Sequence, residues 1–113
     1  MLLPNAEQAV IDPAKLCEYL LNLEHPDGSS KARFLLLGGY LLDAWEQLEK
    51  DIRSQILAQE AISGHSSPYG EKYEIVGPLT GPNGVTLSIR TVWIIRHEQN
   101  APEFITLIPE KKV

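Results

Sequence analysis

The spacing of apolar residues changes its period near the middle of the chain, and this change constrains the fold more than any other feature. Before residue 60, apolar residues recur at helical spacing, as in Leu16, Leu20 and Leu21. After residue 71, apolar and polar residues alternate as they do on a strand. The switch falls in segment 63–68, which is rich in Ser, Gly and Pro. The sequence predicts an α+β domain with about three N-terminal helices packed on an antiparallel meander sheet of three to four strands.

Two short helices are expected before residue 40. The first runs from Asp12 to about Asn22, because Asp is a good N-cap and the proline that follows it suits the first helical position. A loop over 24–29, rich in helix breakers, separates it from a helix over 31–37. One of the two serines before that helix is expected to cap it, and the glycines at 38–39 are expected to end it.

A third and longest helix is expected to begin at Asp43, whose side chain is predicted to cap it. Two favourable ion pairs at i,i+4 spacing lie on its wet face. Its buried stripe consists of four large apolar residues at helical spacing: Trp45, Leu48, Ile52 and Ile56.

Three strands are expected in the second half. The first spans about 72–79, and a loop over 80–84 follows it, in which Asn-Gly supplies the positive φ angles of a hairpin. The second strand, 85–96, is apolar on both faces at one end, so we expect it to be central. The third spans 104–108 and is followed by a proline.

These elements form a single domain over residues 1–113, with a helical part at 12–62 and a sheet part at 71–109. The last strand is expected at an edge of the sheet, with Ile105 and Leu107 uncovered. Dimerisation through this edge or face therefore stays open.

Composition narrows the function classes. The chain has 113 residues, 43% of them hydrophobic and 22% charged, which is the composition of one folded domain. Its net charge of -5 argues against coating DNA or RNA non-specifically, because that binding depends on many Lys and Arg side chains. The longest apolar run, 34–42, is far shorter than the roughly 20 residues that a bilayer needs. With no secretion signal and a single Cys17, we expect a cytoplasmic location.

The common catalytic and cofactor motifs are absent from the sequence, so no cofactor is expected. The histidines His25, His65 and His97 are far apart and fall in expected loops, so no metal site is predicted. Cys17 lies on the apolar stripe of the first helix and is interpreted as a small core residue.

Two cations are candidates for an anion site. Lys31 falls in the first turn of a helix, where a cation is unfavourable, so it either holds an anion or simply points into water. Arg90 lies mid-strand among small hydroxyl residues such as Thr91. Its planar guanidinium suits a phosphate or carboxylate, and the alternative is a cross-strand ion pair with Glu74.

Several spaced motifs together resemble one small bacterial domain family of unknown function. They are the segments 3–7 with 11–12, 24–28, 31–33, and 73–93 with its turn at 78–84. The family is found as short free-standing proteins, notably in cyanobacteria, and at the C-terminus of phage head morphogenesis and polymorphic toxin proteins. The resemblance covers nearly the whole chain and implies no assigned activity.

The order of helices followed by a meander is also similar in architecture to the barnase, EndoU, colicin and RelE group of RNA-cleaving toxins. That resemblance implies a metal-independent endoribonuclease, with His25 as the acid or base and Lys31 and Arg90 as phosphate clamps. Thr91 or Tyr69 would be an auxiliary donor.

The alternative function is a non-catalytic protein-interaction module, such as one member of a two-gene toxin and antitoxin pair. The acidic first half of the chain supports this interpretation, because residues 1–60 hold ten acidic side chains and only five basic ones. The candidate partners are therefore another protein, a second copy of this chain, and RNA. A further option is that the sheet binds a small ligand.

Overall fold

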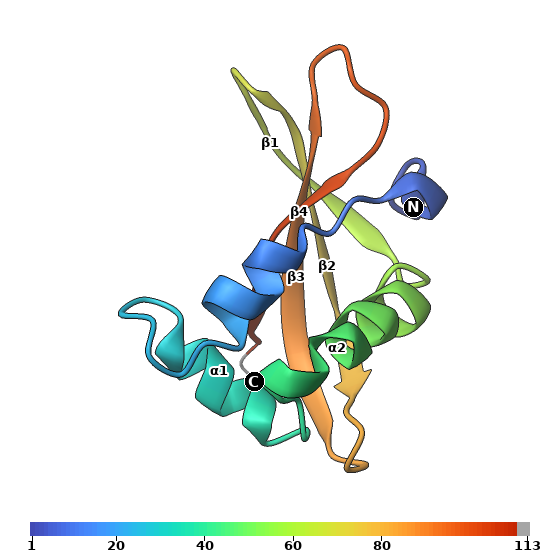
Figure 1. Ribbon diagram of the computed structural model, residues 1–113. Helices are drawn as coiled ribbons and strands as arrows, with labels where there is room; N and C mark the ends of the chain where they lie inside the picture. The colour runs from blue at the N-terminus through green and yellow to red at the C-terminus, as the bar shows by residue number, and fades with distance from the viewer. Residues whose placement is uncertain (111–113) are drawn as a thin grey trace.

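A computed structural model describes residues 1–110 and confirms the predicted α+β class (Figure 1). The helical part contains α1 (Ser29–Leu36) and α2 (Trp45–Asp51), the π-helical segments Lys15–Leu20 and Ile52–Ile56, and 3-10 turns at Ala6–Gln8 and Leu42–Ala44. The sheet part contains β1 (Ala61–Ser67), β2 (Gly70–Thr80), β3 (Thr86–Arg96) and β4 (Glu103–Pro109). The four strands lie in the order β1-β2-β3-β4 and each pairs antiparallel with the next, which makes a meander.

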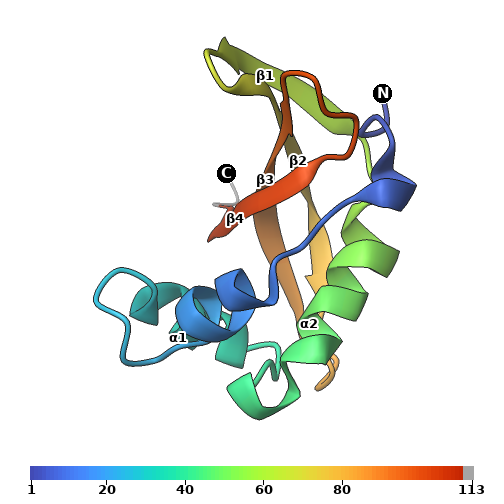
Figure 2. The ribbon, with the colours of Figure 1, turned by 45° about the horizontal axis from the view of Figure 1, so that its top comes forward.

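The helical segments gather on one side of the long β2–β3 hairpin (Figure 2). The prediction that β3 is central is confirmed, because it lies between β2 and β4. Leu87, Ile89, Thr91 and Trp93 on one face of β3 are buried, whereas Arg90 between them lies on the other face and is half-buried. Each large apolar side chain removed from water contributes about 1.5–3 kcal/mol, so this face fixes how the helices sit on the sheet.

The sheet begins earlier than predicted. Segment 63–68, expected as a loop, is mostly strand β1, so the sheet part starts at Ala61 instead of residue 71. β1 is an edge strand of mainly exposed polar residues, and its register with β2 shifts between Ser63 and Ser66. Backbone hydrogen bonds to the neighbouring strand hold an edge strand of this kind in place. Its sequence does not need the alternation of apolar and polar residues that identifies a half-buried strand.

Of the three predicted N-caps, one is confirmed and two are wrong. Asp12 Oδ1 accepts the Ala14 N–H at 3.0 Å, as expected of a cap. α1 begins at Ser29, not Lys31, and no serine side chain caps it. The imidazole of His25 accepts the backbone N–H groups that precede this helix instead. Asp43 does not cap α2, because the chain enters that helix through the 3-10 turn Leu42–Ala44.

The outer edge of β4 is partly covered by the N-terminal segment. The Val10 N–H donates to the Pro102 carbonyl at 2.8 Å, and the Phe104 N–H donates to the Val10 carbonyl at 2.9 Å. The side chain of Ile105, expected to be uncovered, is half-buried. The expectation that Leu107 is uncovered is wrong, because its side chain is fully buried against the helical side. Covering an edge in this way reduces its tendency to pair with another strand.

A buried polar pair links the segment after α1 to α2. The Tyr40 hydroxyl donates to Asp51 Oδ2 at 2.7 Å, and Gln47 Nε2 donates to Asp51 Oδ1 at 2.9 Å. Tyr40 is 1% exposed and Asp51 is 7% exposed. Burial, reinforced by the Asp51 carboxylate, raises the pKa of the Tyr40 phenol well above its usual range.

No helix within residues 1–110 has both the length and the apolar character needed to cross a bilayer.

Candidate anion-binding site

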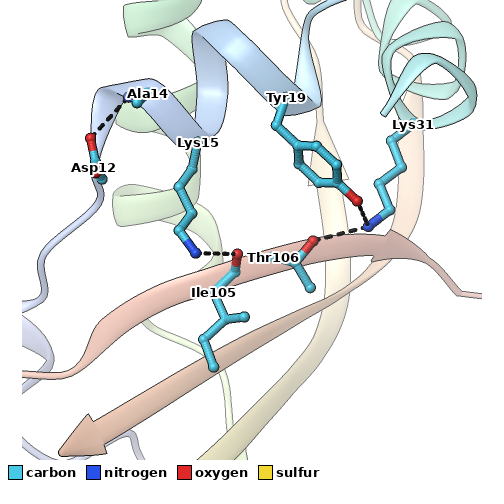
Figure 3. A pocket seen from close by; sticks show the side chains of 7 residues that line it. All are labelled: Asp12, Ala14, Lys15, Tyr19, Lys31, Ile105 and Thr106. Carbon is cyan, nitrogen blue, oxygen red and sulfur yellow. Dashed lines mark hydrogen bonds between the residues drawn. The ribbon is translucent and has the colours of Figure 1, made fainter. Parts of the chain in front are cut away.

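A pocket of about 540 Å³ lies between the π-helical segment Lys15–Leu20, α1 and β4 (Figure 3). We call it the Lys31 pocket. It is lined by Asp12, Ala14, Lys15, Tyr19, Lys31, Ile105 and Thr106.

The π-helical segment positions two of these side chains. The Leu21 N–H donates to the Leu16 carbonyl at 2.9 Å, five residues earlier, and this wide turn is the signature of a π-helix. The wide turn brings Lys15 and Tyr19 to the side that faces β4, while Leu16 and Leu20 are fully buried in the core. π-helical turns are rare in proteins, and those that occur often lie at functional sites.

Lys31 is held by two neutral hydroxyl groups. Its Nζ donates to the Tyr19 hydroxyl at 2.9 Å and to Thr106 Oγ1 at 3.0 Å, and it lies 4.9 Å from the centroid of the Tyr19 ring. Since an ammonium group has three donors, one remains for a ligand. Among residues 1–110, no carboxylate forms an ion pair with Lys31.

Lys15 brings a second cation to the same pocket. Its Nζ donates to the Ile105 carbonyl at 3.2 Å, and it too makes no ion pair with any residue from 1 to 110. The Asp12 carboxylate turns to the Ala14 N–H and away from both lysine head groups (Figure 3). The pocket is therefore locally positive within a chain of net charge -5.

His25 contacts the other side of the same cluster. Its ring packs edge-on against Tyr19 with the centroids 5.0 Å apart. Its Nδ1 accepts the Asp27 and Gly28 N–H groups at 2.9 and 3.0 Å, so the neutral ring carries its proton on Nε2. Tyr19 is thus the shared neighbour of the candidate residues His25 and Lys31.

Arg90 does not line the Lys31 pocket, and two carboxylates hold it. Its Nε donates to Glu110 at 2.7 Å, and its Nη1 donates to Glu74 on the neighbouring strand. The hydrogen bonds from Arg90 hold the pKa of the Glu110 carboxyl below its ordinary value. Of the two interpretations of Arg90, this arrangement is the cross-strand ion pair, extended to a second carboxylate.

Thr91 and Tyr69 also lie outside the pocket. Thr91 is fully buried, and its Oγ1 accepts the Trp93 Nε1–H at 2.8 Å and donates to the Ile75 carbonyl at 3.4 Å. Tyr69 is 70% exposed in the turn between β1 and β2. That turn lies at the opposite end of the molecule from α1 (Figure 1). His25 and Lys31 therefore share Tyr19 as a neighbour, whereas Arg90, Thr91 and Tyr69 do not line the pocket.

Three residues that bind Lys31 or share its charge in the pocket were not predicted as site residues: Lys15, Tyr19 and Thr106. Lys15 and Tyr19 are four residues apart on the first helical segment, so their shared side was readable as a pattern. Nothing in the sequence linked that side to Thr106, because the contact joins segments that are far apart along the chain.

Metal and thiol chemistry find little support elsewhere. Within residues 1–110, no three His, Cys, Asp or Glu side chains cluster as a metal site would require. Partial burial, with Glu46 and Glu18 nearby, raises the pKa of the Cys17 thiol, which disfavours the nucleophilic thiolate.

A smaller hollow of about 260 Å³ lies beside α1, and leucine side chains line most of it. Leu23, Leu41 and Leu42 there are 49%, 53% and 44% exposed. Its lining includes no cation, so it does not suit an anion.

Comparison with known proteins identifies one family. The model of Domain of unknown function (DUF6883) matches residues 2–111, nearly the whole chain. No curated protein matches the sequence significantly, and no solved structure does so either.

Proposed function

The chain belongs to the DUF6883 family, and from the geometry of its own residues we propose that this domain binds a phosphate group in the Lys31 pocket. The single observation that carries the proposal is the environment of Lys31. Its ammonium group is oriented by Tyr19 and Thr106 but neutralised by no carboxylate of residues 1–110. In an acidic chain, a lysine serving stability alone has many carboxylates available to it.

Phosphate suits the donors that surround this space. A tetrahedral phosphate offers strong acceptor oxygens, and lysine binds it as a compact point charge. The free donor of Lys31 supplies a charged hydrogen bond, and Lys15 adds a second positive charge to the pocket. The volume of about 540 Å³ falls within the range of roughly 300–1,000 Å³ that is typical of small-ligand sites.

Replacing Lys31 with Met is expected to weaken phosphate binding about 10- to 100-fold, because a charged hydrogen bond contributes about 1.5–3 kcal/mol. Titration of the protein with inorganic phosphate, followed by backbone NMR shifts, measures this change. Lys72→Met is the matched control, since Lys72 is exposed on β2 and does not line the pocket. Equal phosphate affinity in wild type and Lys31→Met would refute the proposal.

A second candidate function is cleavage of RNA by a toxin-like, metal-independent reaction at the Lys31 pocket and the adjoining His25. The position of His25 against Tyr19 favours it. A protonated His25 ring, formed when Nδ1 releases the Asp27 and Gly28 N–H groups, would give its Nε2 proton to the 5′-oxygen as the P–O5′ bond breaks. The 2′-oxygen would attack phosphorus and pass its own proton to water. Lys31 would stabilise the added charge on the phosphorane. Arg90 contributes no free charge to this reaction, because Glu74 and Glu110 already bind it. This second proposal includes the expectation that the enzyme is bacterial and acts as a toxin or as part of a toxin protein.

Under this second proposal, RNA incubated with the protein and EDTA is cleaved, and His25→Ala and Lys31→Met each lower the rate at least about 100-fold. Denaturing gels of a labelled RNA measure the rate. Arg90→Met is the control that leaves cleavage unchanged if the protein remains folded. RNA that stays intact at high protein concentration rejects the enzyme and leaves phosphate binding to be judged on its own titration.

A further inference from the structure

We infer that the ligand of the Lys31 pocket carries two linked phosphate groups, one held by Lys31 and the other by Lys15. This inference rests on the proposed function and specifies its ligand. It follows from how β4 presents two neighbouring residues to two separate cations.

A bulge in β4 creates this arrangement. Val92 pairs with Thr106 and Trp93 pairs with Phe104, so Ile105 is an extra residue without a partner on β3. Along a regular strand, successive residues turn to opposite sides, and a bulge breaks this alternation. Here the Ile105 carbonyl meets Lys15 while the side chain of the next residue, Thr106, meets Lys31.

The two ammonium groups consequently lie along β4 as two contact points and do not converge on one (Figure 3). Lys31 is anchored to two acceptors, which leaves one donor unused, and Lys15 is anchored to one, which leaves two unused. A single phosphate group held by Lys31 leaves the separately anchored ammonium group of Lys15 without an anion in contact. Two linked phosphates neutralise both, and the ligand then gains a second set of charged hydrogen bonds.

The rest of the pocket lining suits a linked pair of this kind. Ala14 and the Tyr19 ring offer no acidic group, and the one carboxylate of the lining, Asp12, is turned to the Ala14 N–H. Two sources share this chemistry: a small molecule with a diphosphate, and successive phosphates of a single nucleic-acid strand. They differ in spacing, because a nucleoside separates the phosphates of a strand.

The experiment compares three probes by NMR titration: inorganic phosphate, inorganic pyrophosphate, and a thymidine dinucleotide with a 5′-phosphate. We expect pyrophosphate or the dinucleotide to bind at least about tenfold tighter than phosphate. Lys15→Met should abolish this gain and leave the affinity for phosphate within about twofold. Lys31→Met should weaken all three, while Lys72→Met changes none. A gain confined to pyrophosphate identifies a diphosphate ligand, and one confined to the dinucleotide identifies a strand.

The failures of the two proposals are distinguishable. If phosphate binds through Lys31 but neither larger probe binds tighter, the two-phosphate ligand is rejected and the phosphate site stands. An unchanged gain in Lys15→Met also rejects it. If no probe shifts the resonances of the pocket in the wild type, the proposed function fails as well. Unfolding midpoints of each variant, measured in parallel, show that the lost affinity is not lost structure.

Discussion

Replacing Tyr40 with Phe is expected to lower the free energy of unfolding by about 2–3 kcal/mol at pH 7, because it leaves a buried carboxylate without its shortest hydrogen bond. Asp51 is 7% exposed, and Gln47 then remains its one side-chain donor. The ring stays in place, so the loss reports the hydroxyl alone. Urea unfolding of the two proteins measures the difference.

The same substitution is expected to change the alkaline stability. Burial and Asp51 raise the pKa of Tyr40 in the folded state, whereas tyrosine in the unfolded chain ionises near pH 10. The stability from the protonated phenol is therefore fully present below about pH 10 and is lost as pH rises further, by up to about 1.4 kcal/mol per pH unit. Tyr40→Phe lacks this contribution, so the difference between wild type and variant shrinks between about pH 10 and 11.

Tyr69→Phe is the matched control, because Tyr69 is 70% exposed. It should follow the wild type at both neutral and alkaline pH. A Tyr40→Phe protein that is as stable as the wild type at pH 7, or whose deficit persists unchanged to pH 11, would show that Tyr40 does not act through Asp51.

Much of the fold was predictable because the spacing of apolar residues in the packed helices and strands shows which of their faces are buried. β3 alternates along its length, and its apolar end on both faces identified it as central. β1 was missed for the opposite reason: it is an exposed edge of Ser, Gly and His, and backbone pairing with β2 holds it. A stripe of Leu16 and Leu20 fits both an α-helix and a π-helix, so the wide turn was not predictable from spacing.

The candidate site was predictable only in part. Lys31 stood out because a cation at a helix start is locally unfavourable. Its true partners, Tyr19 and Thr106, come from another helical segment and from β4, so local reasoning did not reach them. His25 was identified as a candidate acid or base, but its role in holding the turn before α1 depends on a side-chain-to-backbone geometry that composition does not reveal.

Gly28→Ala is expected to disrupt the Lys31 pocket, although Gly28 is not one of the residues that line it. Gly28 comes so close to the π-helical segment that an added Cβ would lie 2.3 Å from the Tyr19 carbonyl oxygen. That oxygen belongs to the backbone, so the start of α1 and Tyr19 must move apart. Overpacking of this kind costs about 1–3 kcal/mol of stability. Because the Tyr19 hydroxyl orients Lys31, phosphate affinity should fall about as far as in Lys31→Met.

Gly84→Ala separates this effect from a general loss of stability. A Cβ at Gly84 meets nothing within 4 Å, but its φ of +87° makes alanine strained there by about 1–2 kcal/mol. Gly84 lies in the turn between β2 and β3, away from the pocket. We therefore expect both variants to unfold at lower urea concentration and only Gly28→Ala to lose phosphate binding. If Gly28→Ala binds phosphate as the wild type does, the close packing of α1 on Tyr19 is not what holds Lys31 in position, and Thr106 alone must do so.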